Sequence, residues 1–557
     1  MAFIRSERKG EEIYISICET VRLGGKVQQR RLHNLGKLSD YSEESLRRIG
    51  ERLYALGGGN LEDLMKNHCE ELARYNYGFP LILNYLFKAY NLEEFFQRIG
   101  RSHQLNYPFQ EVVLLMLCNR WSEPLSKLGV YDTQRDFYGF PPISLHWLYR
   151  SLDKLAGLST ALQTHLHKEN LKLLDYQLDV VYYDVTTFYF DSEVETENTL
   201  RQKGFSKDGK IGKTQLLLGL LLDKYRNPIG YELYSGDTYE GKTLKDGVLN
   251  LKKRYKLDKV VVVSDSGFLN ETNLQAIHKE GYEFIIGERL KNLPKSVQES
   301  ILDRSDYQVL SLPKSGRPNE NISLWHKIVS YAGRKILCTY SEKRASKDRQ
   351  ERAEKIAKGK SLLKNPALLG RKASIYYLKT SYLDTETGEI SSTKTSPKTH
   401  SFIYEIDEEK IRQAERYDGL KAIATSALTL SNEDILLKYK DLYQIEQAFR
   451  SFKSFLETRP MFHWTDERIK GHFCLCYLSF CLLNYLQKVL KDNDLVQSEN
   501  DIRNLFSKMQ VTHLQQNKHR YYLPAPLSET AKRVLKILKI NKLNDLIPNE
   551  FKINDLY

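Results

Sequence analysis

The feature that most constrains the fold is a series of apolar, β-like segments between residues 178 and 267. The four segments are LDVVYYDVTTFYF (178–190), TQLLLGLLLD (214–223), PIGYELYSG (228–236) and DKVVVVSDSG (258–267). Short apolar runs bounded by turn residues are typical of buried strands. The turn-like sequence KYRN separates the second and third runs, which predicts that they pair as a hairpin.

A helix and a further strand are predicted after these four strands. Asn270 is suited to cap a helix that extends through His278, and YEFIIGER then predicts a strand. Three strands, a fourth, a helix and another strand form the order of a ribonuclease-H-like α/β core. Residues 290–415 interrupt this order with β-like runs such as SIYYLKTSYL, and a long helix is predicted from about 433 to 457.

The remaining segments are predicted to be a hairpin and helices. Residues 12–32 alternate in polarity around Gly24 and Gly25, which predicts a β-hairpin, whereas the pattern from about 40 to 175 is helical. The predicted division is a basic hairpin segment at 1–60, a helical DNA-binding region at 61–175, the α/β core at 176–289 and 416–490, a β-rich insertion at 290–415, and a helical C-terminal region at 491–557.

An excess of positive charge favours polyanionic partners. Lys and Arg outnumber Asp and Glu by 84 to 71, and between Lys343 and Lys372 the ratio is eleven to three. This local block is either a solvated helix face or a phosphate-facing surface, and its imbalance favours the second. Basic residues of the predicted hairpin are open to the same two interpretations, namely Arg22, Lys26, Arg30 and Arg31.

Several features are typical of a cytoplasmic protein. The seven cysteines have no metal-like spacing, so reduced thiols are expected. The sequence MAFIRSERKG lacks the apolar core of a secretory signal. The apolar stretch from Phe473 to Leu486 is too short to span a bilayer, which predicts a buried helix. We therefore expect a cytoplasmic, nucleoid-associated protein without a membrane partner.

Two aspartates occupy unusual places in the predicted strands. Asp184 lies within an apolar strand, where an ionised carboxylate is costly without a partner. Asp265 follows four consecutive valines, at the end of another strand, where sites in α/β sheets are commonly built. Either aspartate alone has the alternative role of capping the next turn. Their position on candidate neighbouring strands favours a shared site.

Glu446 supplies a third carboxylate from the predicted long helix. At about 100° per residue this helix has one apolar and one polar stripe. The apolar stripe consists of Leu442, Ile445, Phe449, Phe452 and Leu456, and the polar stripe of Tyr439, Tyr443, Glu446, Arg450 and Lys453. The polar stripe places Glu446 among phenols and cations that can hold phosphates. An ion pair between Glu446 and Arg450 is the alternative interpretation.

Together the three carboxylates form a set of hard oxygen ligands. Such ligands suit Mg²⁺ or Mn²⁺, which retain water and bind phosphate substrates. Two such ions can activate an attacking oxygen and stabilise a leaving oxygen in phosphoryl transfer. Asp184, Asp265 and Glu446 are therefore the predicted catalytic and metal-binding residues.

At these residues the sequence resembles the DDE transposases of bacterial insertion sequences. It is similar to the group whose glutamate helix carries a tyrosine, arginine, glutamate, lysine signature, here Tyr439, Glu446 and Lys453, with Leu442 at the arginine position. Further similar motifs are HNLGKL, DVTTFYF, KGFSKDGK, SGDTYEGKTL, SDSGF and IEQAFRSFKSFLETRPMFHWTDERIKGH. The departure at Leu442 puts one contact with the transposon end in doubt, and Arg450 is placed to substitute for it.

The resemblance implies cut-and-paste transposition, with a β-rich insertion between the second aspartate and the glutamate. Water would nick the end of the element, and the freed 3′ hydroxyl would form a hairpin and later join target DNA. The implied partners are the terminal inverted repeats, target DNA and a second copy of the chain. Tyr439 and Lys453 would hold phosphates of the end, while His463, Arg468 and His472 fit helix packing or phosphate binding equally well.

Two alternative functions remain. One is a metal-dependent nuclease of the same fold that only hydrolyses DNA. The other is a DNA-binding protein derived from a transposase that no longer catalyses, against which the presence of all three carboxylates argues.

Overall fold

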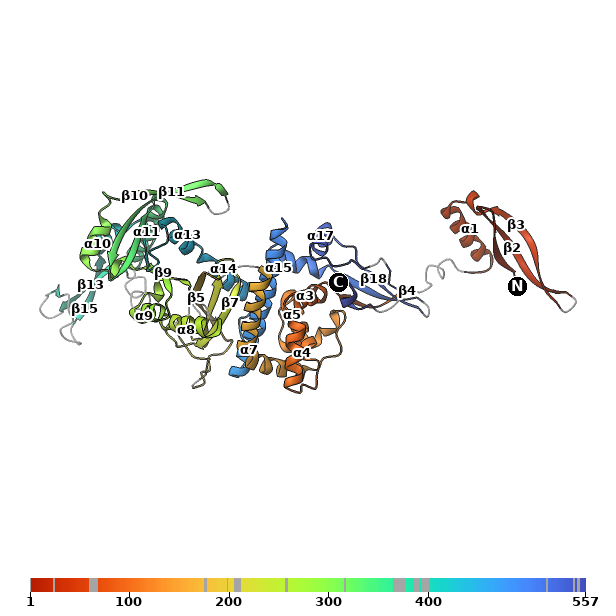
Figure 1. Ribbon diagram of the computed structural model, residues 1–557, viewed down its shortest axis with the longest axis horizontal. Coiled ribbons are helices and arrows are strands. Elements are labelled where there is room, and N and C mark those ends of the chain that lie inside the picture. The colour runs from red at the N-terminus through yellow and green to blue at the C-terminus, as the bar shows by residue number, and fades with distance from the viewer. Residues whose placement is uncertain are drawn as a thin grey trace. The chain divides into compact units, whose positions relative to one another are not determined.

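The computed structural model (Figure 1) describes most of the chain as two compact units. The described residues are 2–23, 26–59, 69–174, 178–197, 199–204, 212–255, 259–314, 317–363, 376–384, 390–391, 400–516, 519–543, 546–547 and 551–556. The first unit comprises Met1–Tyr75, Met509–Pro526 and Lys542–Leu556; the second comprises Asn76–Lys508 and Leu527–Asn541. Gly24, Gly25 and most of the KGFSKDGK motif lie outside the described residues.

The first unit contains two three-stranded sheets. The strands, in sheet order, are β1 (Ala2–Lys9), β2 (Glu12–Leu23) and β3 (Lys26–Lys37), and β18 (His519–Pro524), β17 (Gln510–Gln516) and β4 (Cys69–Asn76). The predicted hairpin is confirmed as β2 and β3, which pair antiparallel. Helix α1 (Glu43–Leu56) begins at Ser42, whose side chain accepts a hydrogen bond from the Ser45 amide.

A nine-stranded mixed sheet organises the second unit. Its strands, in sheet order, are β10 (Gln308–Lys314), β11 (Arg317–Tyr331), β12 (Arg334–Tyr340), β16 (Leu420–Thr425), β9 (Glu283–Glu288), β8 (Val261–Ser264), β5 (Val180–Tyr189), β6 (Gln215–Asp223) and β7 (Pro228–Ser235). The predicted hairpin of β6 and β7 is confirmed. Strand β8 lies parallel to β5, and β9 lies parallel to β8. The α/β fold is therefore built on one large sheet.

Residues from the predicted insertion extend this sheet. Strands β10, β11 and β12 pair antiparallel in succession, and β16 joins β12 to β9. A separate small sheet has the order β14 (Ile390–Ser391), β13 (Leu378–Asp384) and β15 (His400–Ile406). The helices of this part are α10 (Lys295–Leu302), α11 (Glu342–Leu363) and α12 (Glu408–Glu415).

Helices surround the sheet and form the adjoining helical part of the second unit. They are α3 (Gly78–Ala89), α4 (Leu92–Ser102), α5 (Phe109–Ser122), α6 (Lys127–Asp132), α7 (Leu145–Leu174), α8 (Thr243–Tyr255), α9 (Glu271–Lys279), α13 (Asn432–Lys440), α14 (Tyr443–Arg450), α15 (Asp466–Asp492), α16 (Glu499–Ser507) and α17 (Glu529–Ile537). The predicted cap of α9 is confirmed, because the Asn270 side chain accepts from the Asn273 amide. Helices α7 and α15 run side by side (Figure 1).

The apolar stretch from Phe473 to Leu486 lies within α15 and is buried, as predicted. Among the described helices, α15 is the one long and apolar enough to cross a membrane, yet 83% of its apolar window is buried inside the protein. A core helix has these same properties. Six cysteines are free and buried, namely Cys18, Cys118, Cys338, Cys474, Cys476 and Cys481.

Three secondary-structure predictions need correction. The helix predicted from 433 to 457 is broken, because the Leu442 and Gln444 amides bond to the carbonyls three residues back, which tightens the turn between α13 and α14. The C-terminal region contains the hairpin of β17 and β18 besides its helices, and the helical region at 61–175 contains β4. These strands are short and polar, so the helical periodicity of their neighbours conceals them.

Candidate active site

Asp184 and Asp265 lie at neighbouring positions of two adjacent strands. The parallel pairing of β5 with β8 places Tyr182 opposite Val263 and Tyr183 opposite Ser264. The next residue on each strand is therefore Asp184 on one side and Asp265 on the other. Adjacent strands are about 4.8 Å apart, so the two aspartates emerge close together. Asp184 is partly buried, and Asp265, one residue beyond β8, is exposed.

Backbone amides hold both carboxylates. Oδ1 of Asp184 accepts a hydrogen bond of 2.7 Å from the Val185 amide, and Oδ1 of Asp265 accepts one of 2.6 Å from the Ser266 amide. Asp265 thereby caps the short 3-10 helix from Ser266 to Phe268, so the capping role foreseen for it is confirmed. Capping uses one oxygen of Asp265 and does not exclude a second function for this carboxylate.

Glu446 approaches these aspartates on α14, which packs against β5. The apolar stripe of this helix is buried as predicted, with Ile445 fully buried and Phe449 6% exposed. Glu446 itself is exposed, and within the described part of the chain it forms no ion pair with Arg450. The ion pair considered as the alternative for Glu446 is therefore absent there.

Lys421 and Tyr439 connect the three carboxylates. The ammonium of Lys421, on β16, lies 4.6 Å from the centre of the Tyr439 ring. The Lys421 side chain is exposed, but neighbouring protein atoms partly shield its ammonium from water and thereby lower its pKa. The charge of Arg344 also lowers this pKa, whereas the charges of Asp265 and Glu446 raise it. Burial raises the pKa of Tyr439, and the charges of Asp265 and Asp184 add to this rise. Lys421 is thus near Asp265 and Glu446, and Tyr439 is near Asp184 and Asp265.

Tyr439 is a buried neighbour of Asp265. It is 8% exposed, and the Asp265 carboxylate is close enough to help raise its pKa. Gly287 on β9 makes room for it, since a Cβ at this position would overlap the Tyr439 hydroxyl and crowd the Ser266 amide. The predicted phosphate ligand is therefore a buried side chain packed next to Asp265, with little of its surface open to a phosphate.

Lys421 was missed by the sequence analysis. Its signal is a single charge in the strand LKAIAT, where the neighbouring positions Leu420 and Ala422 are buried. Lys421 is a single charge in an apolar strand, as Asp184 is. A lysine in a strand is also common at solvated sheet edges, so this signal alone does not indicate a site.

The donor atoms suit a divalent ion, although they are not yet gathered around one point. In the described ranges, no group of three or more His, Cys, Asp and Glu side chains is close enough to hold a metal ion. Asp184, Asp265 and Glu446 nevertheless offer only carboxylate oxygens, the ligand type that Mg²⁺ and Mn²⁺ prefer.

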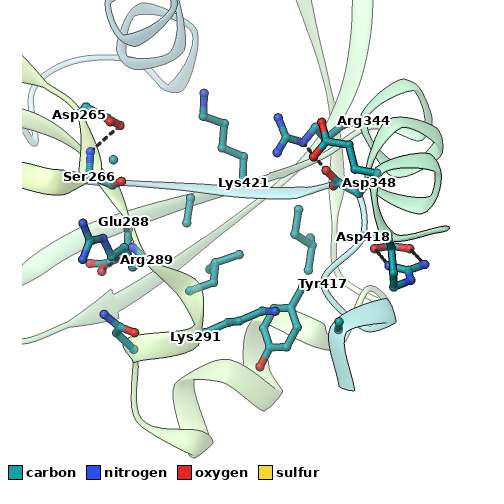
Figure 2. Close-up of a pocket in the computed structure, with 18 of the residues that line it drawn as sticks. Asp265, Ser266, Glu288, Arg289, Lys291, Arg344, Asp348, Tyr417, Asp418 and Lys421 are labelled. Carbon is teal, nitrogen blue, oxygen red and sulfur yellow. Dashed lines mark hydrogen bonds and ion pairs between the residues drawn. The ribbon is translucent and has the colours of Figure 1, made fainter. Parts of the chain in front are cut away.

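A cavity of about 580 Å³ adjoins Asp265. Figure 2 shows Asp265 and Ser266 on one side, Arg344 and Asp348 of α11 on the other, and Lys421 reaching between them. The basic block predicted to face phosphates includes α11, but part of its charge is neutralised. Arg344 pairs with Asp348 at 2.9 Å, and Arg352 binds both oxygens of Asp418.

Lys355 of the basic block is unpaired among the described residues, whereas three other cations of the block lie outside them. Lys355 lines the cavity, is exposed and has no ion pair within the described ranges. Lys364, Arg371 and Lys372 lie outside the described residues. The cavity wall therefore combines neutralised and unpaired cations beside Asp265.

The remaining predicted DNA contacts lie in two places. Arg450 is exposed at the end of α14, and the Lys453 ammonium lies 5.6 Å from the centre of the Phe188 ring, in the π-helical turn from Ser451 to Phe455. The hairpin residues belong to the first unit. Arg30 bonds to Glu19 at 2.8 Å and Arg31 pairs with Glu7 at 3.1 Å, which agrees with the solvated-face interpretation.

Arg22 is exposed on β2, whereas the Lys26 side chain lies outside the described part. The structure thus places Asp184, Asp265, Glu446 and Tyr439 in the second unit, with the two aspartates on adjacent strands. It assigns the four hairpin cations to the first.

Comparisons with known proteins show the family of the chain. Residues 179–482 match the family model described as the transposase DDE domain, and residues 3–72 match the N-terminal domain of IS1634 family transposases. No curated protein matches the chain.

Solved structures show low overall similarity. A piggyBac transposase synaptic complex with hairpin DNA is 10% identical, with 77% of this chain and 78% of that chain covered and a TM-score of 0.34. A Mos1 transposase paired-end complex with left transposon end is 14% identical, with 38% and 60% covered and a TM-score of 0.15. A Mos1 mariner paired-end complex with Mn is 16% identical, with 38% and 61% covered and a TM-score of 0.14.

Proposed function

Because this chain belongs to the transposase DDE family, we propose that it moves an insertion sequence by cut-and-paste, with Asp184, Asp265 and Glu446 as its catalytic residues. The chain is a transposase, and the matched family domain spans all three carboxylates. The observation that supports this assignment most is the β5 and β8 register, which continues from Tyr183 and Ser264 to the two aspartates. Glu446 is the third member because α14 packs on β5.

Enzymes of the DDE type act with divalent metal ions, and we propose two Mg²⁺ or Mn²⁺ ions held by these carboxylates. When bound, the ions activate the attacking oxygen and stabilise the leaving oxygen of the scissile phosphate. The residues of the chain provide the framework. Tyr439 lies buried beside Asp265, and Lys421 places a positive charge near Asp265 and Glu446.

The finer features of the proposal follow the resemblance. We assign the strand order β7, β6, β5, β8, β9 to a ribonuclease-H-like core, and residues 290–415 to a β-rich insertion. The signature is carried by Tyr439, Glu446 and Lys453, with Leu442 at the arginine position. The DNA partners are the terminal inverted repeats and the target, bound by two copies of the chain in the end complex.

The cations of the hairpin and of the glutamate helix are proposed to contact DNA. Arg22 is exposed on β2, and Lys26 is the first residue of β3. Both are proposed to contact DNA from the N-terminal hairpin. Arg30 and Arg31 would first exchange their glutamate partners for phosphates. Arg450 and Lys453 belong to the second unit, where the Lys453 ammonium lies 5.6 Å from the centre of the Phe188 ring of β5, and they are proposed to hold the transposon end.

The product of the reaction tests the proposed function. A duplex that carries the terminal repeat, incubated with the protein, Mg²⁺ and a circular target plasmid, should give molecules in which the element end is joined to the plasmid. Cleaved ends without joined products would identify a nuclease, and end binding without cleavage would identify a DNA-binding protein. Joined products contradict both alternatives.

Lys453→Ala should weaken binding of the terminal-repeat duplex and make it less sensitive to salt. Loss of one phosphate contact lowers the slope of log K against log salt by about 0.9. The measurement is fluorescence anisotropy at several salt concentrations, with Lys440→Ala as the control, because Lys440 is exposed at the end of the preceding helix α13. An unchanged slope for Lys453→Ala would remove this residue from the DNA contacts.

A further inference from the structure

A second cavity, of about 290 Å³, lies beside the segment that links the π-helical turn to α15. Its volume is at the lower end of the range for small-ligand sites. The other wall comes from the end of α5 and the start of α6. This cavity is lined by neither Asp184, Asp265 nor Glu446, so it is separate from the candidate active site.

Two cations are buried in this cavity without a counter-charge. Arg120 is 4% exposed and Lys127 is 3% exposed. Nη1 of Arg120 donates to the Leu456 carbonyl at 2.9 Å, but its Nε has no hydrogen-bond partner. Lys127 has neither a hydrogen bond nor an ion pair with any residue that the structure describes. A buried charge without a partner is costly, so its presence requires an explanation.

The surroundings oppose the charge of Lys127 and do not compensate it. Burial, together with the charge of Arg120, lowers the pKa of Lys127 to about 7. His463 and His472 also line the cavity, and burial together with the neighbouring cations lowers the pKa of each, that of His463 to about 3. Arg468, at the edge, pairs with Asp153 at 3.5 Å.

Glu457 is the one carboxylate among the described residues that line the cavity, and it is exposed. Two buried cations therefore face a single solvated carboxylate. An anion that enters the cavity would supply the missing counter-charge.

The rim adds two aromatic side chains that are unusually accessible. Phe462 is 65% exposed and Trp464 is 64% exposed, and both line the cavity. The guanidinium of Arg201 lies 4.2 Å from the centre of the Trp464 ring. Exposed aromatic rings beside a cationic groove are what proteins use to stack the bases of a nucleic-acid strand.

Backbone hydrogen bonds attach this segment to the strand that carries Asp184. The Met461 amide donates to the Tyr189 carbonyl at 3.2 Å, and the Asp191 amide donates to the Met461 carbonyl at 3.2 Å. Tyr189 follows Asp184 by five residues on β5, which corresponds to about 17 Å of extended chain. Each strand of duplex DNA rises about 3.4 Å per nucleotide along the helix axis, so a duplex running along β5 would place about five nucleotides over this distance.

We propose that this cavity binds one backbone phosphate of the DNA strand, about five nucleotides from the scissile bond, through Arg120 and Lys127. The adjacent base stacks on Phe462 or Trp464. The proposal rests on the proposed function, because the strand is taken to be the DNA substrate of the transposase. It assigns to Arg120 and Lys127 a contact that binds substrate and is not required for metal binding.

Lys127→Met tests this site, because methionine keeps the length of the side chain and removes its charge. We expect the variant to bind the terminal-repeat duplex about tenfold more weakly, with a smaller salt slope. We also expect a higher Tm in the absence of DNA, because a buried, unpaired ammonium has been removed. A lysine with only a structural role would give a lower Tm when replaced. Lys536→Met, on an exposed position of α17, is the matched control.

A scan with single methylphosphonate linkages locates the phosphate. In the wild type, one neutral linkage within several nucleotides of the cleavage site should weaken binding about tenfold, whereas Lys127→Met, which keeps Arg120, should lose clearly less affinity from that same linkage. If the linkage and Lys127→Met reduce DNA affinity independently at every position, so that their fold losses multiply, the proposal is overturned. It is also overturned if Lys127→Met binds DNA as tightly as the wild type.

Binding of inorganic phosphate tests this cavity independently of the proposed function. It should raise the Tm of the wild type and of Glu446→Gln, and have less effect on Lys127→Met. Equal effects on all three proteins would show that the cavity is no phosphate site, even if DNA is cleaved. Failure of the wild type to bind or cleave terminal-repeat DNA would contradict the proposed function, and the phosphate response would still decide the cavity.

Discussion

Glu446→Gln should reduce the rate of strand cleavage by at least about 10³-fold, while terminal-repeat DNA still binds. Glutamine keeps the shape of the side chain but removes the charge that a divalent ion requires, and metal ions supply several kcal/mol of transition-state stabilisation. Glu446 is exposed on α14 and has no ion pair among the described residues, so the substitution should leave folding unchanged. Cleavage of a labelled terminal-repeat duplex with Mg²⁺ measures the effect.

Glu433→Gln is the matched control, because Glu433 is an exposed glutamate in the first turn of the neighbouring helix α13. It should cleave at nearly the wild-type rate. Circular dichroism and the Tm of both variants establish that they are folded. Cleavage by Glu446→Gln at a rate within tenfold of the wild type would exclude Glu446 as a catalytic carboxylate.

Asp265→Cys should abolish cleavage with Mg²⁺ and recover part of it with Mn²⁺ or Cd²⁺. A thiolate is a poor ligand for the hard Mg²⁺ ion and a better one for softer ions, so a change in metal preference identifies a residue that touches the metal. Asp265 is exposed just beyond β8, where a cysteine fits without repacking the core. The measurement is the cleavage rate of the variant with each ion, relative to the wild type.

Asp265→Ala provides the comparison, because it removes the ligand without offering sulfur. It should be inactive with all three ions. If Asp265→Cys and Asp265→Ala respond alike to Cd²⁺ and Mn²⁺, direct coordination by Asp265 is contradicted, and its role would be limited to capping the turn at Ser266.

The core strands and two of the three carboxylate positions could be predicted because their signals are local. Buried strands such as β5 and β6 are nearly continuous apolar runs, and a charge such as Asp184 stands out within them. The apolar stripe of α14 likewise follows from helical periodicity, and it is buried as expected.

Residues that act through distant contacts could not be predicted in this way. Lys421 is separated from Asp265 by more than 150 positions, and only the pairing of β16 with β9 brings the two strands near. The buried cations Arg120 and Lys127 belong to helices whose sequences resemble ordinary packing segments. Strands β17 and β18 are short and polar, so their partner strand β4 decides their conformation more than their own sequence does.

We propose that Asp184, Asp265 and Glu446 together hold two divalent ions. The most direct test is to count bound Mn²⁺ by electron paramagnetic resonance in the complex with terminal-repeat DNA. We predict two ions per chain in the wild type and the loss of at least one in Asp184→Asn and in Glu446→Gln. Two ions bound as tightly in both variants as in the wild type would contradict the assignment.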